Sequence, residues 1–104
     1  MPTPIHITPA ESEVIAALWR CGPLTPPRLI ETLRARRGWS ESTIKTLLAR
    51  LMRKKAVRSE RDDGRLVYRP LLDRETYVAA EVAALVDHLF DGDSTKLADY
   101  LKPR

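Results

Sequence analysis

Apolar residues recur at the i, i+3, i+4, i+7 spacing of an amphipathic helix most regularly in residues 40–55. The buried side of this predicted helix comprises Ile44, Leu47, Leu48 and Leu51. Small, hydroxylated and cationic residues occupy the opposite side, where a helix meant only for solvent would more often mix Glu with Lys. The pattern therefore predicts a helix that packs on a core with one side and meets an anionic partner with the other.

Two further helices are predicted upstream, each introduced by a threonine and a proline. In the first, Thr8 is expected to be the N-cap, Pro9 the first helical residue and Glu11 the second half of a capping box. The Cys-Gly-Pro sequence at 21–23 ends this helix. Its buried stripe is expected to comprise Val14, Ile15, Leu18 and Trp19.

The second helix is expected to start at Thr25-Pro26 and to end near Gly38. Leu24, between the two helices, is expected to form a short extended bridge. The buried side of the second helix is predicted to comprise Leu29, Ile30 and Leu33.

The third helix has its own start signal. Trp39 and Ile44 flank Ser40 at the spacing of a hydrophobic staple, so Ser40 is the expected N-cap. We expect the helix to run to about Lys55.

Residues 57–61 and 65–69 read as two strands joined at Asp62-Asp63-Gly64, where Asp-Gly is a strong hairpin signal, and Pro70 ends the second strand. Three short helices followed by a hairpin predict a mainly α fold with a small β-hairpin, a winged helix-turn-helix. In such a fold the third helix is the recognition helix and the hairpin is the wing.

The composition changes after Asp73. An Ala-rich helix whose apolar residues recur at heptad-like spacing is predicted there, and Gly92 ends it. Asp93 or Ser94 is expected to cap a final short helix. This tail is too apolar to stand alone in water, so it packs either against a second copy, which we favour, or back on its own domain. The expected dimer contacts are Tyr77, Val78, Val82, Leu85, Leu89, Leu97 and Leu101.

Charge is unevenly distributed along the chain. Residues 28–69 hold thirteen Lys and Arg against five Asp and Glu, a net +8, whereas residues 72–104 sum to −3 within an overall +4. A basic middle segment favours nucleic acid as the partner, with a merely solvated basic surface as the alternative.

Length and composition narrow the class of protein. A chain of 104 residues with 43% hydrophobic and 31% charged content fits one small folded domain with an appendage. No apolar run approaches the roughly 20 residues needed to span a bilayer, and the N-terminus does not resemble a signal peptide, so no membrane partner is expected. A single cysteine suits a reducing cytoplasm.

Reading bases in the major groove requires short side chains that offer hydrogen bonds or methyl groups. The predicted base-reading residues are Ser42, Thr43, Lys45, Thr46 and Ala49. The predicted phosphate-binding residues are Ser40, Arg50, Arg53, Lys54, Arg58, Arg61 and Arg65. Asp62 and Asp63 would weaken DNA contact at the hairpin tip, so the wing is expected to contribute less than the helix.

Catalysis finds no support in the sequence, and no enzyme activity is expected. His6 and His88 stand apart, without a nucleophile or carboxylate pattern around either. Cys21 is predicted to be a small buried thiol, with redox sensing as the alternative. One cysteine and two scattered histidines do not form a metal site, and no cofactor is expected.

Two segments resemble the penicillinase-repressor family of BlaI and MecI, which includes the copper-responsive CopY repressors. They are T-x-A-E-x-E-V at residues 8–14, followed by Leu18-Trp19, and W-S-x-x-T-I-x-T-L-x-x-R-L at residues 39–51. The resemblance covers residues 5–72 well and the remainder loosely. It implies a cytoplasmic homodimer that binds palindromic operators, with Ser42, Thr43, Lys45 and Thr46 facing the bases and residues 73–101 forming the dimer arm.

The chain departs from both branches of the family after residue 72. Tyr100-Leu101 is the nearest equivalent of the Asn-Phe bond at which an inducing protease cuts the classical repressors. The cysteine-rich motif of the copper branch has no counterpart here. These departures leave the inducing signal, proteolytic or otherwise, unassigned.

We therefore expect a homodimeric repressor whose residues 1–71 bind a double-stranded DNA operator and whose residues 72–104 form a helical dimerisation region. Two alternatives remain open at this stage: a winged-helix module that binds an acidic protein, and a DNA-binding protein without sequence preference.

Overall fold

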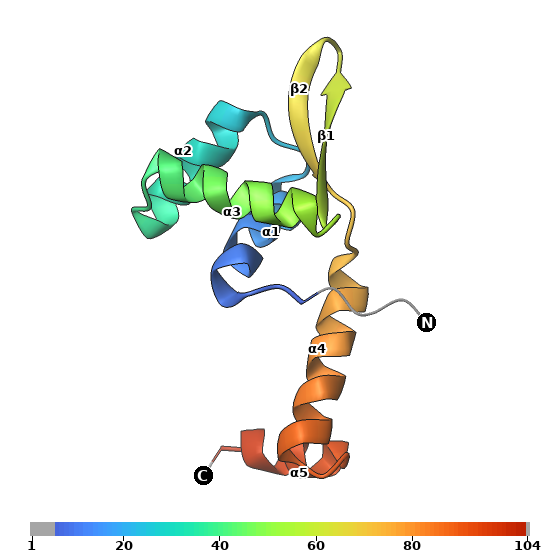
Figure 1. Ribbon diagram of the computed structural model, residues 1–104. Coiled ribbons are helices and arrows are strands. Elements are labelled where there is room, and N and C mark those ends of the chain that lie inside the picture. Colours follow the sequence, from blue (N-terminus) through green and yellow to red (C-terminus); the bar gives the residue numbers. More distant parts are fainter. Residues whose placement is uncertain (1–5, 104) are drawn as a thin grey trace. The chain divides into compact units, whose positions relative to one another are not determined.

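The computed structural model describes residues 6–103, which form two compact units that divide between Leu72 and Asp73 (Figure 1). The first unit contains α1 (Pro9–Cys21), α2 (Pro26–Arg37), α3 (Glu41–Arg53), β1 (Val57–Asp62) and β2 (Arg65–Pro70). The second unit contains α4 (Arg74–Leu89) and α5 (Ser94–Leu101). Three helices followed by an antiparallel hairpin make the first unit a winged helix-turn-helix, as predicted. Within residues 6–103, no helix combines the length and apolar character needed to cross a membrane.

Helix α1 begins with the capping box that the sequence predicted. Thr8 Oγ1 accepts the Glu11 N–H at 3.2 Å, and Glu11 Oε1 accepts the Thr8 N–H at 2.9 Å. These reciprocal bonds satisfy two backbone donors that have no partner within the helix. The helix ends at Cys21, and the N–H of its C-cap residue Gly22 donates to the Leu18 carbonyl at 2.9 Å.

Helix α2 is bounded by Thr25 and Gly38, as expected, although the Thr25 side chain makes no capping hydrogen bond. Gly38 adopts a left-handed conformation with φ +68°, and its N–H donates to the Arg34 carbonyl at 2.8 Å. Leu29 is buried, whereas Ile30, predicted to be buried, is half-exposed.

Helix α3 begins at the predicted N-cap but ends at Arg53, two residues before the predicted end. Lys55 has a left-handed conformation with φ +63°, and the Ala56 N–H donates back to the Leu51 carbonyl at 2.9 Å. This pattern is the Schellman termination of a helix, with lysine where glycine is usual. The chain turns there because Ala56 and Val57 enter the core, with 0% and 1% exposure.

The hairpin strands each extend one residue further than predicted, to Asp62 and Pro70. Asp62 lies opposite Arg65, so the connection has only two residues. Asp63 and Gly64 have φ values of +54° and +80°, the signature of a type I′ turn, whose twist matches that of the strands.

The core of the first unit lies between its three helices and the base of the hairpin. Leu24 is extended, as predicted, and it also pairs with Tyr68 of the hairpin in an isolated bridge, with N–H to carbonyl distances of 3.2 and 2.8 Å. The large buried apolar residues are Ile7, Val14, Ile15, Leu18, Leu29, Leu33, Ile44, Leu47, Leu48, Leu51, Val57 and Val67.

Two residues at the end of α1 differ from expectation. Trp19 is half-buried, and its indole N–H donates to the Leu72 carbonyl at 2.9 Å, so this residue lies at the edge of the core. Cys21 is exposed, so the prediction of a buried thiol is wrong. Cys21 continues the helical stripe of Val14 and Leu18, but it is the last residue of α1 and lies where the core no longer covers that side of the helix.

The second unit is capped by aspartates at both of its helices. The Asp73 carboxylate accepts the Thr76 N–H at 3.0 Å, and Asp93 Oδ1 accepts the Thr95 N–H at 2.9 Å. Asp93, and not Ser94, is therefore the N-cap of α5.

Candidate nucleic-acid interface

The five predicted base-reading side chains lie together on the solvent-facing part of α3. They are Ser42, Thr43, Lys45, Thr46 and Ala49, all exposed. The buried side of the same helix matches the predicted stripe, so the core fixes which way these side chains point. The Thr46 hydroxyl donates to the Ser42 carbonyl at 3.0 Å, and its oxygen can still accept a hydrogen bond. The first turns of α3 thus offer small hydrogen-bonding and apolar groups.

Ser40 and Thr43 are coupled at the start of α3. Ser40 Oγ accepts the Thr43 N–H at 3.1 Å and donates to Thr43 Oγ1 at 3.0 Å. In this arrangement the Ser40 hydroxyl caps the helix, while Thr43 retains its own hydroxyl hydrogen for a partner.

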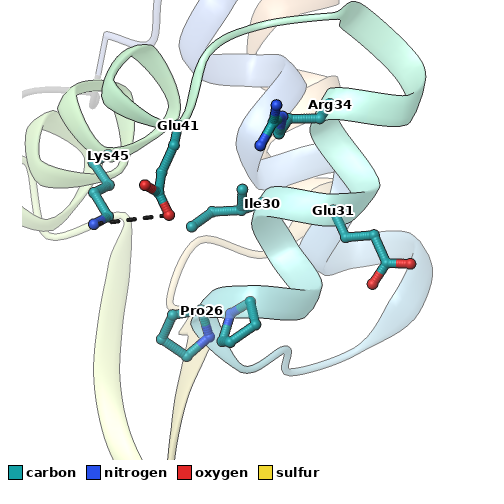
Figure 2. Close-up of a pocket in the computed structure, with 7 residues that line it drawn as sticks. Pro26, Ile30, Glu31, Arg34, Glu41 and Lys45 are labelled. Atoms are coloured by element: carbon teal, nitrogen blue, oxygen red, sulfur yellow. Dashed lines mark ion pairs between the residues drawn. The ribbon is translucent and has the colours of Figure 1, made fainter.

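Lys45 forms an i, i+4 ion pair with Glu41, with 4.0 Å between Nζ and Oε1 (Figure 2). Both side chains are more than half exposed and border an open groove of about 540 Å³ between α2 and α3. The groove is lined by Pro26, Pro27, Ile30, Glu31, Arg34, Glu41 and Lys45. The half-exposed Ile30 forms part of its apolar surface. Sequence reasoning missed Glu41, although the Glu-to-Lys spacing of four residues was visible.

The predicted phosphate-binding cations fall into two groups. Arg50 and Arg53 are exposed in the last turn of α3. Lys54 is different: its ammonium lies 2.6 Å from Glu11 Oε1 and 2.8 Å from the His6 carbonyl. This lysine pairs with a carboxylate whose side chain is 0% exposed, so it has a structural partner in the free protein, and its contact with a DNA phosphate stays a prediction.

The Glu11 carboxylate is charged in spite of its burial. Burial is the largest single influence and by itself would raise the pKa, but hydrogen bonds from Lys54 and Thr8 together hold the pKa of Glu11 below its ordinary value. The pair ties the start of α1 to the residue that follows α3. Sequence reasoning could identify Glu11 only as a capping residue, because its partner lies far along the chain.

The hairpin carries further arginines, and two of them share one carboxylate. Arg58 donates to Glu60 Oε2 at 2.8 Å, and Arg69 donates to Glu60 Oε1. The hydrogen bond from Arg69 is the main reason that the pKa of Glu60 lies below its ordinary value. Arg61 and Arg65 flank the turn as predicted, and Arg61 donates to the Gly64 carbonyl at 3.2 Å. Arg69 was not among the predicted site residues, although a two-residue turn implies that it lies opposite Arg58.

The predicted dimer contacts lie in α4 and α5 and are largely uncovered. Tyr77, Val78 and Leu97 are half-buried, whereas Val82, Leu85, Leu89 and Leu101 are 41–70% exposed. Val86, which was not predicted as a contact, is the one buried side chain among the described residues of this unit.

No three His, Cys, Asp or Glu side chains within residues 6–103 lie together in a way that would hold a metal ion.

Comparison with known proteins agrees with this arrangement. The family model described as penicillinase repressor matches residues 7–101. The chain belongs to the penicillinase-repressor family. Members of the family are transcriptional repressors and not enzymes, in line with the lack of a catalytic pattern in the sequence.

Two curated relatives align with most of the chain. The penicillinase repressor of Bacillus licheniformis is 28% identical over 87 residues, which are 84% of this chain and 68% of that protein. An uncharacterised 16.5 kDa protein from Latilactobacillus sakei is 32% identical over 84 residues, or 81% of this chain. The chain spans 58% of the length of the latter.

Two solved structures of the repressor BlaI share the fold. The DNA-binding domain of the repressor BlaI matches with a TM-score of 0.63 and 31% identity, covering 74% of this chain and 94% of that domain. The monomeric form of B. licheniformis BlaI in complex with the blaP half-operator matches with a TM-score of 0.65 at the same identity and coverage.

Proposed function

We propose that this protein represses transcription by binding operator DNA through α3, as a homodimer on a palindromic site. The observation that carries the proposal is the outward side of α3, where five exposed base-reading candidates are held by a fully buried opposite side. A protein of similar structure was determined in complex with a half-operator, which supports the same use of the fold here. Repression follows when the bound protein excludes polymerase from the promoter.

The dimer is supported by the apolar surface of the second unit. Val82, Leu85 and Leu89 recur at heptad-like spacing along α4 and remain 41–61% exposed. Exposed apolar side chains gathered in this way mark a surface that a partner covers. Residues 1–71 would then bind DNA and residues 72–104 would hold two copies together. Such a dimer, acting in the cytoplasm, would present its two recognition helices about 34 Å apart, one turn of DNA.

Selection from a random pool of duplexes tests this function directly. We expect the enriched sequences to share a palindromic consensus and to bind two chains per duplex in sedimentation measurements. Enrichment without a consensus would indicate DNA binding without sequence preference. If no duplex is retained even at low salt, DNA binding itself is refuted, and a protein partner becomes the better explanation of the basic surface.

Substitutions in α3 should separate base reading from phosphate binding. Lys45→Ala and Thr46→Ala should each reduce the ratio of operator affinity to random-DNA affinity about 5- to 10-fold, because a base contact is worth about 1–3 kcal/mol of discrimination at best. Arg53→Ala should weaken binding to both duplexes by the same factor and reduce the salt slope by about 1. Titration of fluorescent duplexes at several salt concentrations measures both quantities.

Lys96→Ala is a charge-matched control for Lys45→Ala. Lys96 also pairs with a carboxylate, Asp91, at 2.9 Å, but it lies in α5. Replacing Lys96 should leave the ratio of operator affinity to random-DNA affinity unchanged. Equal losses of discrimination for Lys45→Ala, Thr46→Ala and Arg53→Ala would contradict the assignment of α3 as the base-reading element.

A further inference from the structure

Two arginines stand directly opposite each other in the hairpin. The antiparallel register pairs Arg58 of β1 with Arg69 of β2. Like charges at directly opposed positions destabilise a pair of strands unless an anion lies between them. The hairpin therefore presents two guanidinium groups that together need an anionic partner.

Glu60 supplies that anion in the free protein. Each of its carboxylate oxygens accepts from a different arginine, with 2.8 Å between Arg58 Nη2 and Oε2 and a second bond from Arg69 to Oε1. The Glu60 side chain is 24% exposed, whereas the Arg58 and Arg69 side chains are 57% and 42% exposed. The two arginine side chains are therefore more exposed than the glutamate side chain that they hold.

A phosphodiester presents the same chemistry as this carboxylate. Both groups offer two anionic oxygens to N–H donors, and the planar fork of arginine binds either of them. Arg58 also follows α3 by only a few residues, and α3 and β1 are in contact, so the pair of arginines lies close to the last turns of the helix that faces DNA in the proposed function.

We propose that Arg58 and Arg69 form a backbone-phosphate clamp, which Glu60 occupies until a DNA phosphate displaces it. The proposal rests on the DNA binding proposed above and adds Arg69 and Glu60 to the interface. Glu60 acts as an internal competitor that lowers the affinity for DNA of every sequence, because a phosphate must exchange with a carboxylate that is already bound. It contributes no base discrimination, since neither arginine needs to reach a base edge.

The chain contains a closely matched control for Glu60. Glu13 of α1 also lies between two arginines, Arg36 and Arg37, and its side chain is 25% exposed. Hydrogen bonding from Arg37 is the main cause that lowers the pKa of Glu13, as the bond from Arg69 does for Glu60. Glu13→Gln and Glu60→Gln therefore make the same change of charge in similar surroundings, but only the second opens the proposed clamp.

The test compares the two variants on a fluorescent duplex of random sequence over a series of salt concentrations. Glu60→Gln should bind about 5-fold more tightly than wild type because no carboxylate has to be displaced, with a similar log–log salt slope because one phosphate occupies the clamp in both complexes. Glu13→Gln should change the affinity less than about 2-fold, the effect of net charge alone. The preference for operator over random DNA should be unchanged in both.

A double-mutant cycle makes the result specific to the clamp. Arg69→Gln should reduce affinity more in the Glu60→Gln background than in wild type, because the competitor has been removed there. Glu60→Asp, which keeps the charge but cannot reach both arginines, should give a smaller gain than Glu60→Gln, and it supplies the test if Glu60→Gln does not fold.

Several results would overturn the clamp while leaving the proposed function intact. They are equal gains from Glu60→Gln and Glu13→Gln, additive effects in the cycle, or weaker DNA binding by Glu60→Gln. A wild-type protein that binds no DNA would instead refute the proposed function itself.

Discussion

Leu89→Glu is expected to make the protein monomeric and to lower its affinity for a complete operator about 100-fold or more. The reason is that linking two DNA-binding domains typically raises the overall affinity by a factor of about 10²–10⁴. The Leu89 side chain is 61% exposed and shares a side of α4 with Val82 and Leu85. In the proposed dimer this side is covered by the second copy. A carboxylate introduced there would be buried without a partner, which disfavours association strongly.

Two controls distinguish loss of the dimer from loss of the fold. Ala80→Glu introduces the same charge on the opposite side of α4, where the residue is exposed, and should leave the protein dimeric. A duplex with a single half-site should bind Leu89→Glu as well as it binds wild type, because one copy is sufficient there. Sedimentation and operator titration measure both effects. A Leu89→Glu protein that remains dimeric with full operator affinity would refute the assignment of this surface.

Lys54→Met is expected to lower the free energy of unfolding by about 2–3 kcal/mol. Removing one partner of a buried ion pair typically costs about 3–5 kcal/mol, and the lower figure applies here because the Lys54 side chain is 33% exposed. The Glu11 carboxylate left behind is 0% exposed, and its Oε2 has no hydrogen-bond partner among the described residues. Against a typical domain stability of about 5–15 kcal/mol, this loss is large.

Urea denaturation at neutral pH measures the loss, with Lys55→Met as the control. Lys55 is the next residue, is exposed, and forms no ion pair within the described part of the chain. Its replacement should change stability by no more than about 0.5 kcal/mol, as is usual for surface substitutions. Equal stability of the two variants would show that the Glu11–Lys54 pair contributes nothing.

The effect of Lys54→Met should also depend on pH. The folded-state pKa of Glu11 lies below the ordinary value of 4.5, so the pair stabilises the protein above that value and loses its contribution as pH falls through the folded-state pKa. The difference in stability between wild type and Lys54→Met should therefore shrink on acidification below about pH 4.5. A difference that grew on acidification would contradict this account.

Helix and turn positions were predictable because their causes are local. The Thr8 cap, the Ser40 cap and the turn at Asp63-Gly64 each depend on residues within four positions of one another. The buried stripe of α3 was likewise correct in full, since its period follows from helix geometry. The side of α3 that carries the base-reading candidates follows from that stripe.

Errors occurred where burial depended on packing between elements. Cys21 was expected to be buried beside Trp19, but it is exposed at the end of α1. The end of α3 was misplaced because Ala56 and Val57 are drawn into the core, so the helix stops at Arg53 in spite of a sequence that could continue it. No residue within a few positions of Cys21 indicates its exposure, and none near Arg53 indicates that the helix ends there.

By itself, the sequence determined which helices and strands this protein forms, their winged-helix order and the outward side of α3. Only the tertiary structure decided which of the basic residues form ion pairs within the protein. It pairs Lys54 with Glu11, 43 positions away, and it places Arg58, Glu60 and Arg69 together across the hairpin. The physical reason is that a helix period or a turn arises from neighbouring residues, whereas an ion pair depends on which distant parts of the chain the core brings within a few ångströms.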